Sequence, residues 1–273
     1  MLGKLIKHEI KQTFRSVSTI YIILAAISVA LLISSAVGIT VFKALANAAL
    51  IIGTIVMAVM TLVAIIKNFS DTLYGRQGYL SFTLPVKGSS LLLSKILISA
   101  LWLLCAVILM ILVYIVMYIS VMGENGIESL GTIKNLVEDM GLAELLPSKG
   151  AIITLLVIGA TLLLMTFIIL IGFIYFSITV ANTRALQSHP KLYGILVFLG
   201  SYIAVNAISN PITERFPLSL QVTSDKVYIA AASMTESEAM FSYGIAGVLF
   251  KFIIAVGLLV FTGWIMEHKV NVK

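Results

Sequence analysis

Long uncharged apolar runs alternate along this chain with shorter segments that carry the charged residues. A helix needs about 20 residues to cross the roughly 30 Å of hydrocarbon in a bilayer. Six runs are candidates for such spans: 20–42, 44–66, 96–119, 151–180, 192–208 and 243–266. Five are long enough, whereas 192–208 is marginal and 151–180 is long enough to tilt or to extend beyond the bilayer. The pattern predicts an all-α integral membrane protein with six transmembrane helices.

Composition leads to the same class. Hydrophobic residues make up 60% of the 273 residues and charged residues only 11%, which is more apolar surface than one soluble core could cover. The single cysteine, Cys105, lies within the third run and cannot form a disulfide inside the chain. The first apolar run is as long as a span, so we expect no cleavable signal peptide.

The placement of charge predicts the orientation. Segments 1–19, 67–95, 181–191 and 267–273 hold 12 Lys or Arg residues against three acids, while the segments on the other side hold five bases and nine acids. Basic residues concentrate on the cytosolic side of membrane proteins. Both termini are therefore expected in the cytosol. Anionic lipid headgroups account for the net charge of +6, and no nucleic acid partner is expected.

The first 18 residues, MLGKLIKHEIKQTFRSVS, have the pattern of an amphipathic helix. One half of the helical wheel carries the apolar residues Leu2, Leu5, Ile6, Ile10, Phe14 and Val17. The bases cluster within about 80° on the other side, and they are Lys4, Lys7, Lys11 and Arg15. Such a helix lies in the headgroup plane with its apolar face in the acyl boundary. The alternative is a cytosolic stub whose charges only follow the orientation rule.

The residue types that are missing from the six runs argue against several function classes. The runs contain no Asp, Glu or Arg, whereas ion-coupled transporters commonly place ionisable groups at membrane depth. Backbone carbonyls can bind sodium, so such a carrier is disfavoured rather than excluded. All three histidines fall at or outside the ends of the runs, and the chain has no HExxH motif. We therefore expect no catalytic residue, no metal site and no enzyme activity in this chain.

A few polar residues within the runs are candidates for a transport pathway. Lys251 is the one charged residue in a run, and its ammonium group either snorkels to the headgroups or faces a polar path. Asn206 and Tyr114 are further candidates. In helical bundles, polar side chains of this kind more often join helices than bind cargo.

The connector 67–95 between the second and third runs keeps many apolar side chains. It contains YGRQGYLSFTLPVKGSS, in which Tyr79, Leu80, Phe82 and Leu84 would be exposed in a simple loop. The pattern predicts a short helix that Asn68 or Ser70 caps and that Gly75 ends in the left-handed conformation, followed by a docking segment. The alternative is that these side chains lie against the underside of the membrane.

These segments resemble a known family. The start MLGKLIKHEIKQTFR, the six-span plan and above all FSDTLYGRQGYLSFTLPVKGSSLLLSKIL are similar to permease subunits of type-2 ATP-binding-cassette exporters from low-GC Gram-positive bacteria. The resemblance is specific mainly over residues 1–97. It implies an elbow helix at 1–18 and a transmembrane domain at 19–273. In that domain, 67–95 would hold a cytosolic coupling helix, and 121–150 and 209–242 would be extracellular loops.

The resemblance also implies partners and residue roles. A separate cytosolic ATPase would bind ATP and Mg²⁺, a second permease subunit would complete the pathway, and this chain would need no cofactor. The implied ATPase-coupling residues are Asp71, Leu73, Tyr74, Arg76, Tyr79, Leu80, Phe82 and Pro85. The basic residues of 1–18 would anchor the elbow on lipid headgroups, and 182–191 would form a second, smaller ATPase contact.

The interior of the predicted spans suggests the type of cargo. Because it is nearly free of charge, it suits amphipathic or hydrophobic cargo, such as a bacteriocin, another secreted helical peptide or a drug. The expected function is therefore export across a bacterial plasma membrane. An ion-coupled carrier and a non-transporting sensor subunit are the alternatives.

Overall fold

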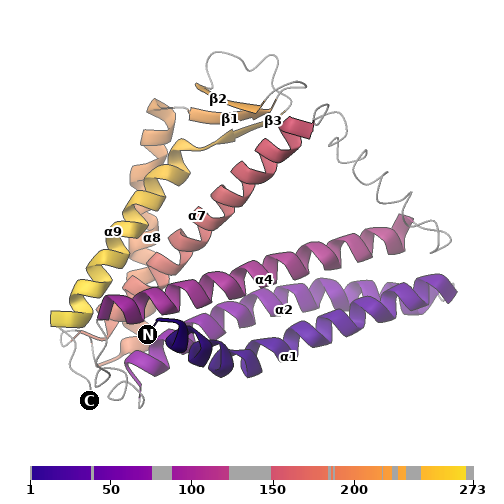
Figure 1. The fold of residues 1–273 in the computed structure, drawn as a ribbon, viewed down its shortest axis with the longest axis horizontal. Coiled ribbons are helices and arrows are strands. Elements are labelled where there is room, and N and C mark those ends of the chain that lie inside the picture. Colours follow the sequence, from indigo (N-terminus) through magenta and orange to yellow (C-terminus); the bar gives the residue numbers. More distant parts are fainter. Residues whose placement is uncertain are drawn as a thin grey trace. The chain divides into compact units, whose positions relative to one another are not determined.

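The computed structural model describes residues 2–37, 40–75, 88–122, 149–183, 186, 188–216, 218–222, 227–231 and 241–268. The helices in this part of the chain are α1 (Leu2–Val37), α2 (Thr40–Leu73), α4 (Gly88–Met122), α7 (Lys149–Ala181), α8 (Pro190–Arg215) and α9 (Ala246–His268). The strands are β1 (Leu218–Val222), β2 (Val227–Ala231) and β3 (Phe241–Gly244) (Figure 1). Within the described ranges, six helices are long and apolar enough to cross a membrane. The predicted six-span helical architecture is confirmed, and the chain is a multi-pass membrane protein.

Three predicted span boundaries were wrong. The break between the first two spans lies between Val37 and Thr40 instead of at Lys43, because a lysine does not stop a helix and its long side chain can reach the headgroups. Helix α8 continues through Pro211 to Arg215 instead of ending near 208. The last helix begins at Ala246, since Tyr243 belongs to β3.

The predicted extracellular loop 209–242 contains a small antiparallel sheet in addition to the end of α8. Its strand order is β2-β1-β3, with Leu218 opposite Ala231 and Leu220 opposite Tyr243. The backbone N–H of Ile245 also donates to the Leu218 carbonyl at 2.8 Å. The sheet therefore connects α8 directly to the start of α9. For the other predicted extracellular loop, 121–150, residues 123–148 lie outside the described part of the chain.

The chain divides into two compact units. Unit 1 consists of residues 1–68 and 97–143, and unit 2 of residues 69–96 and 144–273. Helices α2 and α4 contribute to both units, because they have 34 and 35 residues. At 1.5 Å per residue they are about 50 Å long, compared with about 30 Å for the hydrocarbon core. The ends of α2 and α4 that flank the connector belong to unit 2.

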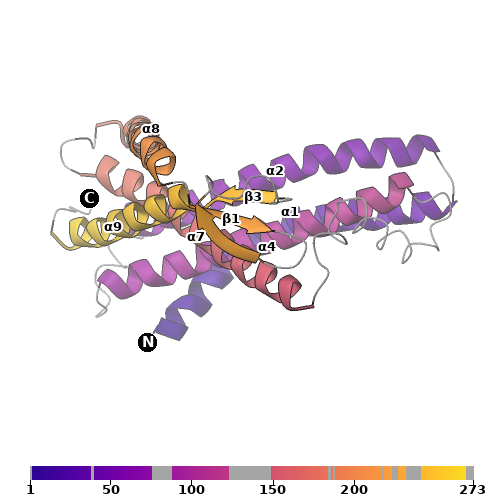
Figure 2. The same ribbon diagram turned by 90° about the horizontal axis from the view of Figure 1, so that it is seen from above.

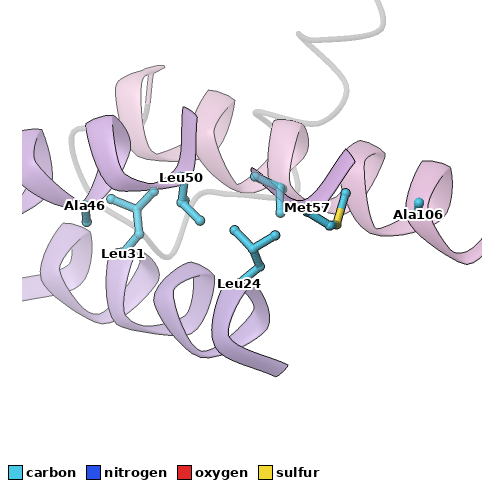
Figure 3. Close-up of a cluster of buried hydrophobic side chains, with 7 residues drawn as sticks. Leu24, Leu31, Ala46, Leu50, Met57 and Ala106 are labelled. Carbon is cyan, nitrogen blue, oxygen red and sulfur yellow. The ribbon is translucent and has the colours of Figure 1, made fainter. Parts of the chain in front are cut away.

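Unit 1 has an apolar core between α1, α2 and α4. Leu24 and Leu31 of α1 point toward Leu50 and Met57 of α2 (Figure 3), and all four side chains are at most 2% exposed. Gly53 lies next to Leu24, and a Cβ at Gly53 would be 2.6 Å from Leu24 Cδ2. These helices therefore pack by side-chain interdigitation.

Unit 2 is built around α7, which packs on both α8 and α9 (Figures 1 and 2). Helices α7 and α9 come close at Gly172, where a Cβ would lie 3.1 Å from the Ala255 carbonyl oxygen and 3.2 Å from the Ala255 Cβ. Small residues let transmembrane helix backbones come this close. At Gly172 the two helix backbones are therefore separated by little more than the Ala255 methyl group.

Candidate functional site

The structure describes three of the eight predicted ATPase-coupling residues. Asp71 is exposed, Leu73 is fully buried, and Tyr74 is half-buried just after the end of α2. The other five, Arg76, Tyr79, Leu80, Phe82 and Pro85, lie outside the described residues, so their docking role stays a prediction. Since Leu73 and Tyr74 are turned into unit 2, we expect them to act within the chain.

The short helix predicted to start at Asn68 or Ser70 is not formed. Both residues lie inside α2, which runs without interruption to Leu73 because nothing between 44 and 73 breaks a helix. The Ser70 carbonyl accepts bonds from the backbone N–H groups of Tyr74 and Gly75 at 2.8 and 3.1 Å. Gly75 follows the helix end but does not adopt the left-handed conformation. A coupling helix between 76 and 87 would lie outside the described residues.

The end of α2 is attached to α7 by aromatic contacts. Phe69 is fully buried, and its ring stacks on Tyr175 with a centroid distance of 3.8 Å and an interplanar angle of 12°. The Tyr74 ring meets Phe69 edge-on at 6.1 Å. Such aromatic pairs contribute about 0.5–1.5 kcal/mol each beyond the burial of their area.

Two hydrogen bonds complete this attachment. The Tyr74 hydroxyl donates to Thr179 Oγ1 at 2.9 Å, and the Tyr175 hydroxyl donates to the backbone carbonyl oxygen of Lys95 on α4 at 3.2 Å. Tyr175 and Thr179 are one helical turn apart on α7. Both flanks of the connector are therefore bound to the same turn of α7. We call Phe69, Tyr74, Lys95, Tyr175 and Thr179 the loop clamp.

The environment of the loop clamp is largely closed to water. Burial raises the pKa of Tyr74 to about 12, and the hydrogen bond with Thr179 opposes this rise only in part. Tyr175 and Thr179 are fully buried, and Lys95 is 1% exposed. Each polar contact in such a site costs more to break than it would at the surface.

Lys95 and Tyr175 were not predicted as functional residues. Lys95 was counted only as a cytosolic base at the end of the connector, but α4 begins seven residues earlier, at Gly88, and places Lys95 two turns inside a helix. A buried lysine in a membrane helix is costly and rare. Had the helix been predicted to start at Gly88, Lys95 would have stood out as a candidate functional residue. For Tyr175, the sequence offered only one indication, which was its hydroxyl group within the apolar run 151–180.

The amphipathic start of the chain differs from its prediction. Residues 2–37 form one helix, and its first turns run at an angle to the rest (Figure 1), so no separate helix ends at residue 18. Ile6, Ile10 and Val17 pack with Ile98 and Trp102 of α4. Protein covers much of the face that was expected to contact lipid. An elbow role remains a prediction.

The basic face of this start is described only in part. Lys7 and Lys11 are exposed, as headgroup contacts require. The side chains of Lys4 and Arg15 lie outside what the structure describes. Anchoring by these four bases therefore stays a prediction.

A second group of buried polar side chains lies in unit 1. Glu9 is 7% exposed, and its Oε2 accepts a hydrogen bond from Asn68 Nδ2 at 3.0 Å. One turn along α1, the Thr13 hydroxyl donates to the Glu9 carbonyl at 2.9 Å and accepts from Trp102 Nε1 at 2.8 Å. These bonds tie the start of α1 to α2 and α4.

The three pathway candidates, Lys251, Asn206 and Tyr114, are divided between the two units, and their pathway role stays a prediction. Tyr114 is 55% exposed and belongs to unit 1, whereas half-buried Lys251 and Asn206 belong to unit 2. The Asn206 amide donates to the Tyr202 carbonyl of its own helix at 2.8 Å. In the predicted second ATPase contact, 182–191, Ser188 and His189 are exposed.

Within the described ranges, no group of three or more His, Cys, Asp or Glu residues could hold a metal ion. Around the connector, the structure brings together the residues of the loop clamp. No family model, curated protein or solved structure matches the chain.

Proposed function

We propose that this chain is the membrane-spanning permease subunit of an ATP-driven exporter in a bacterial plasma membrane, with both termini in the cytosol. The proposal begins with the similarity of the connector to coupling segments of type-2 ATP-binding-cassette permeases. The observation that carries it is the loop clamp, because a connector with both flanks bound to a third helix is suited to pass movement into the membrane domain.

The lengths of α2 and α4 support this role. Each helix is about 20 Å longer than the hydrocarbon core is thick, and the ends that carry the connector extend without a break. ATP would bring two ATPase subunits together, and a connector lodged in one of them would move as a rigid body with it. The permease then converts a difference in binding free energy between two states into a helix rearrangement. ATP hydrolysis belongs to the partner, and the permease itself catalyses no bond cleavage.

The cargo proposed is an amphipathic or hydrophobic compound, such as an antimicrobial peptide or a drug. The spans present mainly aliphatic side chains, with scattered Thr, Asn and Tyr hydrogen-bonding groups, and a small hydrophilic solute would need more fixed polar groups. A second permease subunit, identical or paralogous, would complete the pathway.

Co-purification tests the proposal. The chain is co-expressed with an ATP-binding-cassette ATPase encoded in its gene neighbourhood and is purified in mild detergent, as wild type and as Tyr79→Asp and Leu80→Asp variants. We expect wild type to retain the ATPase and both variants to lose it or to lose coupled hydrolysis. Leu218→Asp is the matched control, because Leu218 is a partly exposed apolar residue on β1, outside the connector. If wild type never binds or alters the ATPase, the proposal is wrong.

An ion-coupled carrier remains a second candidate because of one observation. Glu9 is a buried carboxylate that accepts a hydrogen bond from Asn68. It precedes the apolar span that begins at Val17, and a carboxylate there is a group that can bind a proton. In proteoliposomes without any ATPase, this reading expects cargo movement driven by an ion gradient and abolished by Glu9→Gln. Absence of gradient-driven movement in wild type would exclude it.

A further inference from the structure

Unit 2 contains a continuous series of contacts from the connector to the interior of α9. It begins at the loop clamp, where Tyr74 and Phe69 hold Thr179 and Tyr175 of α7. Tyr175 lies three residues after Gly172, so both are within one turn of the same helix. Gly172 in turn lies close to Ala255 of α9, 3.1 Å from its carbonyl oxygen when measured from an added Cβ. The series therefore crosses from the end of α2 to α7, follows one turn of α7, and crosses to α9.

This series ends next to a charged residue in a span. Lys251 precedes Ala255 by four residues on α9, and residues four apart lie on the same side of a helix. Lys251 is half-buried, whereas Ala255 is fully buried. A movement that reaches Ala255 therefore also displaces the turn that carries Lys251.

We propose that α7 receives the movement of the connector and passes it to α9, with Tyr175 and Thr179 as positioning residues for transport. The inference rests on the proposed function and assigns the step inside the membrane domain. The Phe69 ring is stacked on Tyr175, so a displacement of the end of α2 toward α7 pushes on Tyr175, because close-packed protein interiors deform little. The Tyr74–Thr179 and Tyr175–Lys95 bonds fix which turn of α7 is engaged. The contact without side chains at Gly172 makes α9 follow α7 instead of repacking against it.

The consequence is a division of roles between the connector and the α7 residues of the loop clamp. Residues of the connector that meet the ATPase determine whether the complex forms. Tyr175 and Thr179 are fully buried within unit 2, so they determine how much of the movement reaches α9. Their loss is expected to leave assembly and ATP hydrolysis intact while reducing transport and the response of α9.

A reporter on α9 tests this relay. Cys105 is replaced by alanine, and Ile253, which is 69% exposed on α9, is replaced by cysteine and labelled with an environment-sensitive fluorophore. The labelled chain is reconstituted in lipid nanodiscs with the ATPase encoded beside its gene, and fluorescence is recorded with and without Mg²⁺-ATP. Tyr74→Phe and Tyr175→Phe each remove one clamp hydroxyl and leave the ring. Tyr202→Phe is the matched control, because Tyr202 is an exposed tyrosine of α8 outside the clamp.

We expect an ATP-dependent change in wild type and in Tyr202→Phe, and a change reduced at least about threefold in both clamp variants, as loss of one hydrogen bond would cause. An undiminished change in both clamp variants, with the ATPase bound, would overturn the relay and leave the proposed function in place. Loss of the ATPase from Tyr175→Phe would also overturn it, since Tyr175 would then serve assembly. If wild type binds no ATPase, the proposed function fails and the relay with it.

Discussion

The hydrogen bond between Tyr74 and Thr179 offers a quantitative test of the loop clamp. Its oxygen atoms are 2.9 Å apart, and the Thr179 hydroxyl is fully buried. Tyr74→Phe removes the donor, so the Thr179 hydroxyl oxygen loses this hydrogen bond. Thr179→Val removes the acceptor, so the Tyr74 hydroxyl loses it instead. Each single change should lower the free energy of unfolding by about 1–2 kcal/mol, because a buried polar group loses its partner.

The double variant Tyr74→Phe/Thr179→Val distinguishes this bond from general damage. Replacing both partners by apolar groups of similar shape is close to neutral. The combined loss should therefore be much smaller than the sum of the single losses, with a coupling free energy of about 2–3 kcal/mol. Thr161→Val on the same helix is the control, since Thr161 is exposed and its hydroxyl bonds only to the Val157 carbonyl of its own helix at 2.8 Å.

The assay is reversible unfolding in mixed micelles at increasing denaturing detergent, followed by intrinsic tryptophan fluorescence. An unchanged dependence on detergent would show that the variants share one unfolding reaction. If the single losses add to the double loss within about 0.3 kcal/mol, the two side chains do not interact. The assignment of Tyr74 to the clamp would then be refuted.

Three further outcomes are expected in the same unfolding assay. Gly172→Leu should lower the free energy of unfolding by about 1–3 kcal/mol or more through overpacking. Its control is Gly159→Leu, which should be neutral or stabilising because a Cβ at Gly159 meets nothing within 4 Å. Equal effects of the two changes would contradict the close contact of α7 and α9. Gly75→Ala places a Cβ 2.6 Å from the Asp71 carbonyl oxygen, so the backbone beside Tyr74 must shift. The coupling free energy between Tyr74 and Thr179 should therefore fall, and an unchanged value would argue against the backbone geometry at Gly75. Because the pKa of Tyr74 is raised to about 12 from 10.0, the contribution of its protonated hydroxyl to stability is fully present below pH 10 and is lost as the pH rises through 12, by at most about 3 kcal/mol. A wild type that loses no more stability than Tyr74→Phe over this range would refute this assignment.

The membrane spans could be predicted because their signal is local. Twenty uncharged apolar residues in a row have few structural alternatives, and all six predicted runs correspond to helices. The ends were less predictable, since a helix stops where its backbone geometry changes and not where a charge appears. Lys43 did not end a span, and Pro211 did not end α8.

The sheet and the loop clamp could not be predicted for a different reason. Strands of four or five residues have too few positions to show a period against an apolar background. The clamp joins residues that are up to 110 positions apart, from Phe69 to Thr179, and one sequence carries no information on such pairing. The connector was recognisable as an unusual segment from its exposed aromatic pattern, but its attachment to α7 became visible only in three dimensions.

The close contact of Gly172 with Ala255 also limits how α9 can move. A shift that brought a larger side chain to Gly172 would crowd Ala255, where even a Cβ would lie only 3.1 Å from the carbonyl oxygen, whereas pivoting about the contact keeps it intact. Ala255 lies about 13 Å from the start of α9 and about 20 Å from its end. A rotation of α9 about this contact would therefore move its two ends in opposite directions.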